Sequence, residues 1–189
     1  AKSEDAPQNI LAIVGAGHLV GMAPGFTTPP DQNRMDELTI KPPSSRMGYY
    51  IGWAICVFIL GMFYVGYQQS PELGWNLVVT WVLINGGLSA LGAAIALAHP
   101  ISILVAFFAA PLTSLNPTVG AGMMVGLVES YLRKPKVLDF ERLRDDISSF
   151  PMWWKNGVVR VLLVFFFANV GSAVGTYVAG ASIIQQVLE

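Results

Sequence analysis

Charged residues are scarce in this chain of 189 residues, and two long stretches lack them almost completely. Asp, Glu, Lys and Arg make up 12% of the sequence, whereas soluble domains carry about 25%. From Met47 to Val128 the acidic, basic and histidine side chains are limited to Glu72 and His99, and Val161–Leu188 has none. Stretches of this length and composition are typical of membrane-spanning helices.

Several other absences exclude whole classes of function. The lone Cys56 rules out an internal disulfide framework and a cysteine-based zinc site. The net charge of −1 excludes a basic nucleic-acid-binding protein, so we expect no nucleic acid partner. The motifs His-Glu-x-x-His and Gly-x-Ser-x-Gly, the P-loop and an Asp within an apolar segment are all missing. These patterns would mark common membrane and soluble hydrolases.

Composition divides the chain into three parts. Residues 1–26 are predicted to be the end of a soluble domain with a short α/β remnant. Residues 27–45 form a proline-rich linker, with prolines paired at 29–30 and at 42–43. Paired prolines fix φ and break helices, so an extended linker is expected. Residues 46–189 are predicted to form an all-α membrane domain.

Three apolar segments are long enough to cross a bilayer. They are predicted at residues 48–67, 75–98 and 158–187. The segment 68–74 contains Pro71 and Gly74, which predict a short loop and an antiparallel return of the second helix.

A fourth apolar stretch, 99–133, is interrupted by prolines. Pro111 and Pro117 lie on either side of Thr113, Ser114 and Asn116, and this combination is incompatible with a continuous helix. Each flank spans about half a bilayer at about 1.5 Å per residue. Broken backbone at this depth requires a protein or aqueous environment.

Two topologies remain open for this stretch. As a re-entrant hairpin it leaves three full spans and places the basic residues before the first helix and those in 133–155 on the same, cytoplasmic side. As a full crossing it gives four spans, and Arg34, Lys41 and Arg46 then violate the positive-inside rule. Charge and flank length favour the hairpin. In 133–155, the helical spacing of Phe140 and Ile147 predicts an amphipathic surface helix.

A glycine-rich turn with a histidine follows the predicted strand Asn9–Val14. Gly15-Ala-Gly-His18 would place an imidazole at the carboxyl end of that strand, where a metal ligand or a base is plausible. A hydrogen-bonded turn histidine is the alternative. A dinucleotide-binding turn is disfavoured because Pro24, Pro29 and Pro30 interrupt the helix that it requires.

Polar side chains inside the apolar segments are the second group of candidates. We predict a membrane polar pocket that contains Asn85, Thr113, Ser114, Asn116 and Asn169. The alternative is ordinary hydrogen bonding between helices, which is common for these residue types. Glu129 is expected to pair with Arg133, four residues later.

The residues around these candidates resemble a known family. The block Ala109–Met123, with Ala-Pro-Leu-Thr-Ser-Leu-Asn-Pro at its centre, is similar to the membrane region of the TraB/PrgY family. The segments Gly126–Pro135 and Asn169–Thr176 also resemble it. Val14–Gly21 is similar to the end of that family's soluble domain.

The resemblance implies a link to the shutdown of peptide pheromone signalling. It also implies a soluble domain similar to the Tiki metalloproteases, which hold a divalent metal with two Gly-x-x-His motifs and acidic residues. Gly15 and His18 match the second motif. The first would lie upstream in a longer protein, so we expect no metal to be held by this chain alone, and enzymatic activity stays open.

Three functions therefore remain. The first is a multi-pass module of the cell membrane that anchors a metal-dependent domain acting on, or sequestering, small peptides. The second is a channel or transporter-like module with a solute site at the Pro111–Pro117 break. The third is a structural anchor without a site. The expected partners are the lipid bilayer, a small peptide and a second copy, packed through small-residue helix faces such as Gly48/Gly52.

Overall fold

The computed structural model describes Gly15 and residues 21–22, 31–39, 46–116 and 118–188. The chain divides into two units, residues 1–45 and residues 46–189. The predicted strand Asn9–Val14 lies outside the described residues.

The linker contains a helix where an extended segment was expected. Helix α2 spans Gln32–Thr39, between the two proline pairs. The Asp31 carboxylate accepts a hydrogen bond from the Asn33 backbone N–H at 3.0 Å. This bond satisfies one of the free donors at the start of the helix, and no proline interrupts the eight residues that follow.

Three helices of the second unit are long and apolar enough to cross a membrane: α3 (Met47–Gln69), α4 (Pro71–Ile95) and α9 (Gly157–Leu188). Ser70 alone connects α3 to α4, so the predicted loop 68–74 is wrong at both ends. The Ser70 hydroxyl accepts a hydrogen bond from Leu73 N at 3.1 Å. Pro71 occupies the first helical position, where its fixed φ and missing N–H are well tolerated.

The interrupted stretch forms two shorter helices, α5 (Pro100–Thr113) and α6 (Ala121–Arg133). The turn before α5 contains Leu97 with a φ of 56°. His99 caps α5 through its Nδ1 atom, which accepts a hydrogen bond from Ile101 N at 3.2 Å.

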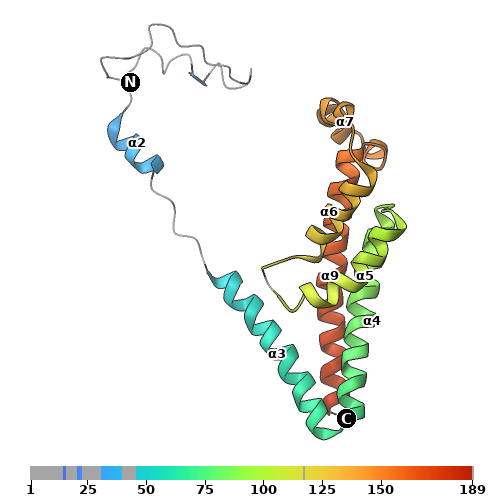
Figure 1. The fold of residues 1–189 in the computed structure, drawn as a ribbon. Helices are drawn as coiled ribbons and strands as arrows, with labels where there is room; N and C mark the ends of the chain where they lie inside the picture. Colours follow the sequence, from blue (N-terminus) through green and yellow to red (C-terminus); the bar gives the residue numbers. More distant parts are fainter. Residues whose placement is uncertain (1–14, 16–20, 23–30, 40–45, 117, 189) are drawn as a thin grey trace. The chain divides into compact units, whose positions relative to one another are not determined.

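Helices α5 and α6 make a helical hairpin, as Figure 1 shows. The backbone N–H of His99, just before α5, donates to Glu129 Oε2 near the end of α6 at 2.8 Å. At the same end of the bundle, Trp154 Nε1 donates to the carbonyl oxygen of Ile95 at 3.1 Å. The stretch therefore starts and finishes at one end of the bundle, and among the described residues only α3, α4 and α9 are long and apolar enough to cross a membrane.

The segment after α6 is not one amphipathic helix. It contains α7 (Val137–Glu141), α8 (Leu143–Ile147) and a short 3₁₀ turn, η2 (Phe150–Met152). Asp146 is buried, and its carboxylate accepts a hydrogen bond from Asn156 Nδ2 at 2.8 Å. Phe140, Ile147 and Phe150 are exposed.

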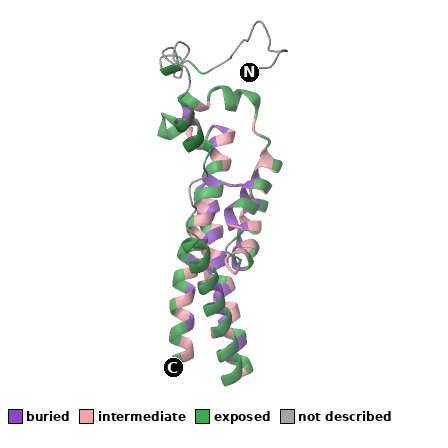
Figure 2. Ribbon diagram, turned by 90° about the vertical axis from the view of Figure 1, so that its left-hand side faces the viewer, coloured by how far each residue is buried: buried purple, intermediate pink, exposed green. Residues whose placement is uncertain are grey.

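Small residues allow α4 and α9 to lie in close contact. A Cβ atom added to Gly92 would collide with the Phe167 carbonyl oxygen, and one added to Gly171 would collide with that of Leu88. Figure 2 shows the buried residues on the sides of the helices that face one another, while the outer sides are exposed. These outer sides are rich in large apolar residues, as expected for a lipid-facing surface.

Candidate polar site within the membrane domain

Asn85, in the middle of α4, is the centre of a hydrogen-bond network. Its side chain is fully buried. Its Nδ2 donates to Thr176 Oγ1 at 2.9 Å and to Ser114 Oγ at 3.1 Å. Its Oδ1 accepts a hydrogen bond from Ser172 Oγ at 3.1 Å. The network therefore connects α4, α9 and the turn of the hairpin, and its polar groups satisfy one another away from water.

Proline chemistry explains how the hairpin turn is held. Pro111 has no N–H, so the carbonyl of Phe107 lacks its usual helical partner. Gly86 lets α4 approach that carbonyl, because a Cβ there would collide with it. The carbonyl oxygen of Pro111 accepts a hydrogen bond from the buried Trp81 Nε1 at 3.0 Å. The broken end of α5 is thus packed directly against α4.

A cavity of about 270 Å³ lies beside this network. The hairpin turn forms one wall, α9 the second and α3 the third. The lining side chains are mostly small or apolar. Its polar lining residues come mainly from the turn and from α9: Thr113, Ser114, Asn116, Asn169, Ser172 and Thr176.

The predicted pocket residues therefore separate into two places. Thr113, Ser114, Asn116 and Asn169 all line the cavity, whereas Asn85 is buried behind Ser114. Thr113 Oγ1 donates to its own helix, at the carbonyl oxygen of Ala109. Asn116 Oδ1 accepts a hydrogen bond from Thr118 N at 3.0 Å and stabilises the turn.

Asn169 differs from the other asparagines. Its Oδ1 accepts a hydrogen bond from Gly122 N at 2.9 Å. This contact fixes the orientation of the amide, because an N–H can donate only to the oxygen. A Cβ at Gly122 would lie 2.5 Å from Asn169 Nδ2, and a Cβ at Gly120 would lie 2.7 Å from Oδ1. The two glycines therefore make room for the amide.

Sequence reasoning missed Cys56, Ser172 and Thr176 as members of this region. The Cys56 Sγ atom lies 3.6 Å from the carbonyl oxygen of Ser114. Small polar residues on α9 at 172 and 176 are four apart and follow Asn169 at helical spacing. That spacing is a signal which places them on one face.

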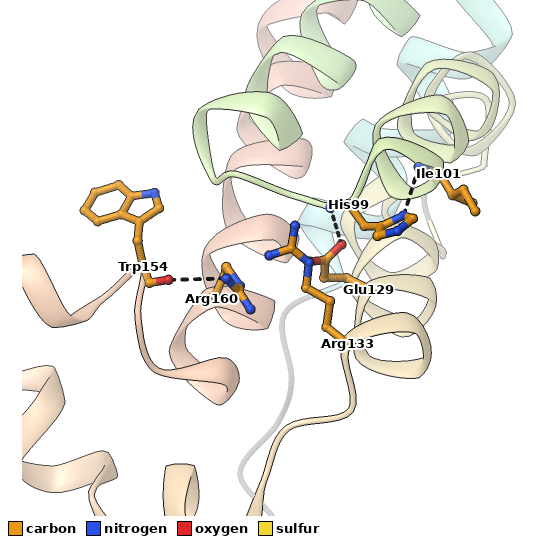
Figure 3. Close-up of polar contacts among 6 residues, drawn as sticks. All are labelled: His99, Ile101, Glu129, Arg133, Trp154 and Arg160. Carbon is orange, nitrogen blue, oxygen red and sulfur yellow. Dashed lines mark hydrogen bonds and ion pairs between the residues drawn. The ribbon is translucent and has the colours of Figure 1, made fainter.

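A buried charge closes the open end of the hairpin (Figure 3). Glu129 is fully buried, and its Oε1 lies 3.0 Å from Arg133 Nε, which confirms the predicted pair. In Figure 3 the side chains of Glu129, Arg133 and Arg160 converge near the turn that carries His99. Arg160 Nη1 also donates to the carbonyl oxygen of Trp154 at 3.5 Å.

The predicted metal ligands cannot be placed beside this region. Gly15 is exposed, and His18 lies outside the described residues. Among the residues that the structure describes, no group of three or more His, Cys, Asp or Glu side chains could hold a metal ion. What the described part of the membrane domain contains is a small cavity and a set of hydrogen-bonding side chains beside it.

Comparisons with known proteins identify a family relationship. Residues 47–188 match the family model described as TraB family protein, C-terminal domain. An uncharacterized protein of Methanocaldococcus jannaschii is 30% identical over 177 residues, which cover 89% of this chain and 44% of that protein. The chain thus spans less than half the length of this relative. No solved structure matches it.

Proposed function

The chain belongs to the TraB family, and we propose that residues 46–189 are a membrane-embedded module that anchors a metal-dependent soluble domain. That domain would inactivate or sequester small peptides. One observation supports the anchoring part: α3 and α4 are joined by Ser70 alone and run in opposite directions (Figure 1), so α3 starts on the side of the membrane where α4 ends. The basic segment after α6 lies at the same end. Chain that precedes α3 would therefore meet the membrane on that side.

Charge supports a cytoplasmic location for this side. The segment between α6 and α9 carries Arg133, Lys134, Lys136, Arg142, Arg144 and Lys155, and Arg46 immediately precedes α3. The turn between α3 and α4 has no Lys or Arg. By the positive-inside rule the basic side faces the cytoplasm, and the protein would be a multi-pass protein of the cell membrane.

The proposed chemistry belongs to residues before the membrane domain. His18, in a Gly-x-x-His motif that starts at Gly15, would supply one ligand to a divalent metal, and an upstream segment would supply the others. A neutral imidazole is a common ligand for catalytic metals, and the bound metal would activate water for peptide hydrolysis.

Self-association would use the small-residue face that the fold leaves open. Gly122 and Gly171 already face neighbouring helices within the chain. Nothing lies within 4 Å of a Cβ built at Gly48 or at Gly61. Gly48 is near the start of α3 and belongs to the predicted Gly48/Gly52 pair, so a second copy would pack there.

The test uses the full-length parent protein in membranes. We expect a stoichiometric divalent metal and peptide cleavage in the wild type, and the loss of both in His18→Ala. His99→Asn is the matched control, because asparagine also caps helices and His99 lies in the membrane domain. A wild type without metal, or a His18→Ala variant that keeps both properties, would overturn the chemical part. The anchoring part fails if the protein without residues 46–189 remains in the membrane fraction.

A further inference from the structure

The cavity beside the hairpin turn lies deep in the membrane. Asn169 is twelve residues after Gly157, the first residue of α9, and this corresponds to about 18 Å along the helix. The hydrocarbon core of a bilayer is about 30 Å thick. Whatever reaches the cavity sideways must therefore be soluble in lipid.

The cavity is open toward the outside of the bundle. Tyr177, Ala173 and Asn116 line it and are exposed. On the α3 side, Gly52 and Ile55 form the wall, and α3 diverges from α9 and from the hairpin toward its start (Figure 1). The opening consequently faces lipid and gives a molecule in the bilayer a route to the polar floor.

The floor offers a hydrogen-bond donor. Ser114, Ser172 and Thr176 are occupied in the network around Asn85. The Asn169 Oδ1 atom accepts a hydrogen bond from Gly122 N. The Asn169 Nδ2 atom has no acceptor among residues 46–116 and 118–188. An amide N–H group in an apolar environment is stabilised by an acceptor, and a carbonyl oxygen is the commonest acceptor on an otherwise apolar molecule.

The volume of the cavity limits the size of the ligand that it can hold. At about 270 Å³, the cavity is slightly smaller than the range of about 300–1,000 Å³ that is typical of sites for drug-sized molecules. It accommodates a head group, with the remainder of the molecule left between α3 and the lipid. Mostly small or apolar walls and a few polar groups are the usual composition of such sites.

We propose that this cavity binds the carbonyl-bearing head group of a lipid-soluble molecule, with Asn169 Nδ2 as the donor to the carbonyl oxygen. A quinone ring and the ester group of an acyl lipid share this chemistry. The site goes beyond the proposed anchoring function and rests only on the membrane embedding of residues 46–189, not on the metal-dependent domain. It also requires no channel, because the polar groups around Asn85 are bonded to one another.

The experiment uses the purified protein in nanodiscs and two probes labelled with ¹³C at the carbonyl. One is duroquinone, a fully substituted quinone, and the other is methyl palmitate. Isotope-edited infrared spectroscopy follows the carbonyl stretch, which moves to lower frequency on hydrogen bonding. Titration gives the dissociation constant. Saturable binding of either probe with a lowered carbonyl frequency supports the site, and the probe that binds identifies the source of the carbonyl.

Two variants test the assignment to this cavity. Asn169→Leu removes the donor and is expected to weaken binding about five- to tenfold and to abolish the frequency shift. Ala173→Phe fills the cavity while leaving the hydrogen-bond network intact, and it is expected to prevent binding. Asn76→Leu and Ala54→Phe are matched controls on exposed helix faces outside the cavity lining, and they should bind like the wild type.

The outcome is decisive either way. The proposal is supported if Asn169→Leu weakens binding and abolishes the frequency shift, Ala173→Phe prevents binding, and both controls bind like the wild type, provided that the variants remain monodisperse. Absence of saturable binding of both probes to the wild type overturns it. So does binding that survives Ala173→Phe with an unchanged carbonyl frequency.

Discussion

The carboxylate of Glu129 accepts a hydrogen bond from the backbone N–H of His99 at 2.8 Å. The two residues are thirty positions apart, and the bond joins α6, near its end, to the cap of α5. The same carboxylate is paired with Arg133. One buried side chain therefore closes the open end of the hairpin and holds its two arms on one side of the bundle.

Removal of this side chain should destabilise the fold strongly. Glu129→Ala leaves the His99 N–H without its acceptor, while the partly exposed Arg133 guanidinium can still be hydrated, so we expect a loss of about 1–3 kcal/mol. Glu129→Gln keeps an acceptor for His99 and should lose less. Denaturant titration in detergent micelles measures the free energy of unfolding. Equal stability of Glu129→Ala and the wild type would contradict this role.

The network around Asn85 should contribute less per bond but involve several bonds. Interhelical hydrogen bonds in membrane proteins average about 0.6 kcal/mol each. Asn85→Leu removes the bonds to Ser114, Ser172 and Thr176, so a loss of about 2 kcal/mol is expected. Ser89→Ala removes a single bond to the carbonyl oxygen of Ala168 and serves as the comparison. The prediction fails if both variants unfold at the same denaturant concentration.

Close packing of α4 on α9 should depend on Gly92, which contacts α9, and not on Gly87, which lies in open space. Gly92→Ala adds a methyl group that collides with the Phe167 carbonyl, and we expect a loss of about 1–3 kcal/mol. Nothing lies within 4 Å of a Cβ at Gly87. Gly87→Ala should therefore leave stability unchanged or raise it by up to about 1 kcal/mol. Thermal unfolding of the two variants distinguishes them, and a destabilised Gly87→Ala protein would refute this packing account.

The spanning helices were predictable because their length and apolar composition are visible locally. The residues at which these helices begin and end were harder to predict. Pro71 was interpreted as part of a loop, yet proline is favoured at the first position of a helix, and Ser70 caps α4 in front of it. The amphipathic helix in 133–155 was predicted from the spacing of apolar residues. That spacing contains no sign that Asn156 donates a hydrogen bond to the Asp146 carboxylate.

Contacts within one helix of the hairpin and the polar site could be predicted from the sequence, whereas contacts between helices could not. Glu129 and Arg133 are four apart, so their pairing follows from helical geometry. The bond from Glu129 to His99 depends on how two helices pack, and the sequence left the topology open. Similarly, Asn85 and Asn169 look equivalent in the sequence. Packing buries Asn85 against Ser114 and Thr176, while Asn169 lines the cavity.

Site-directed labelling tests the re-entrant hairpin most directly. In a Cys56→Ala background, single cysteines replace Leu97 before α5, Lys136 after α6 and Gln68 at the α3–α4 turn, all of them exposed. A membrane-impermeant maleimide is applied to vesicles of each orientation. We predict that Leu97→Cys and Lys136→Cys react from the same side and Gln68→Cys from the opposite side. Labelling of Leu97→Cys and Lys136→Cys from opposite sides would contradict the hairpin and require four spanning segments.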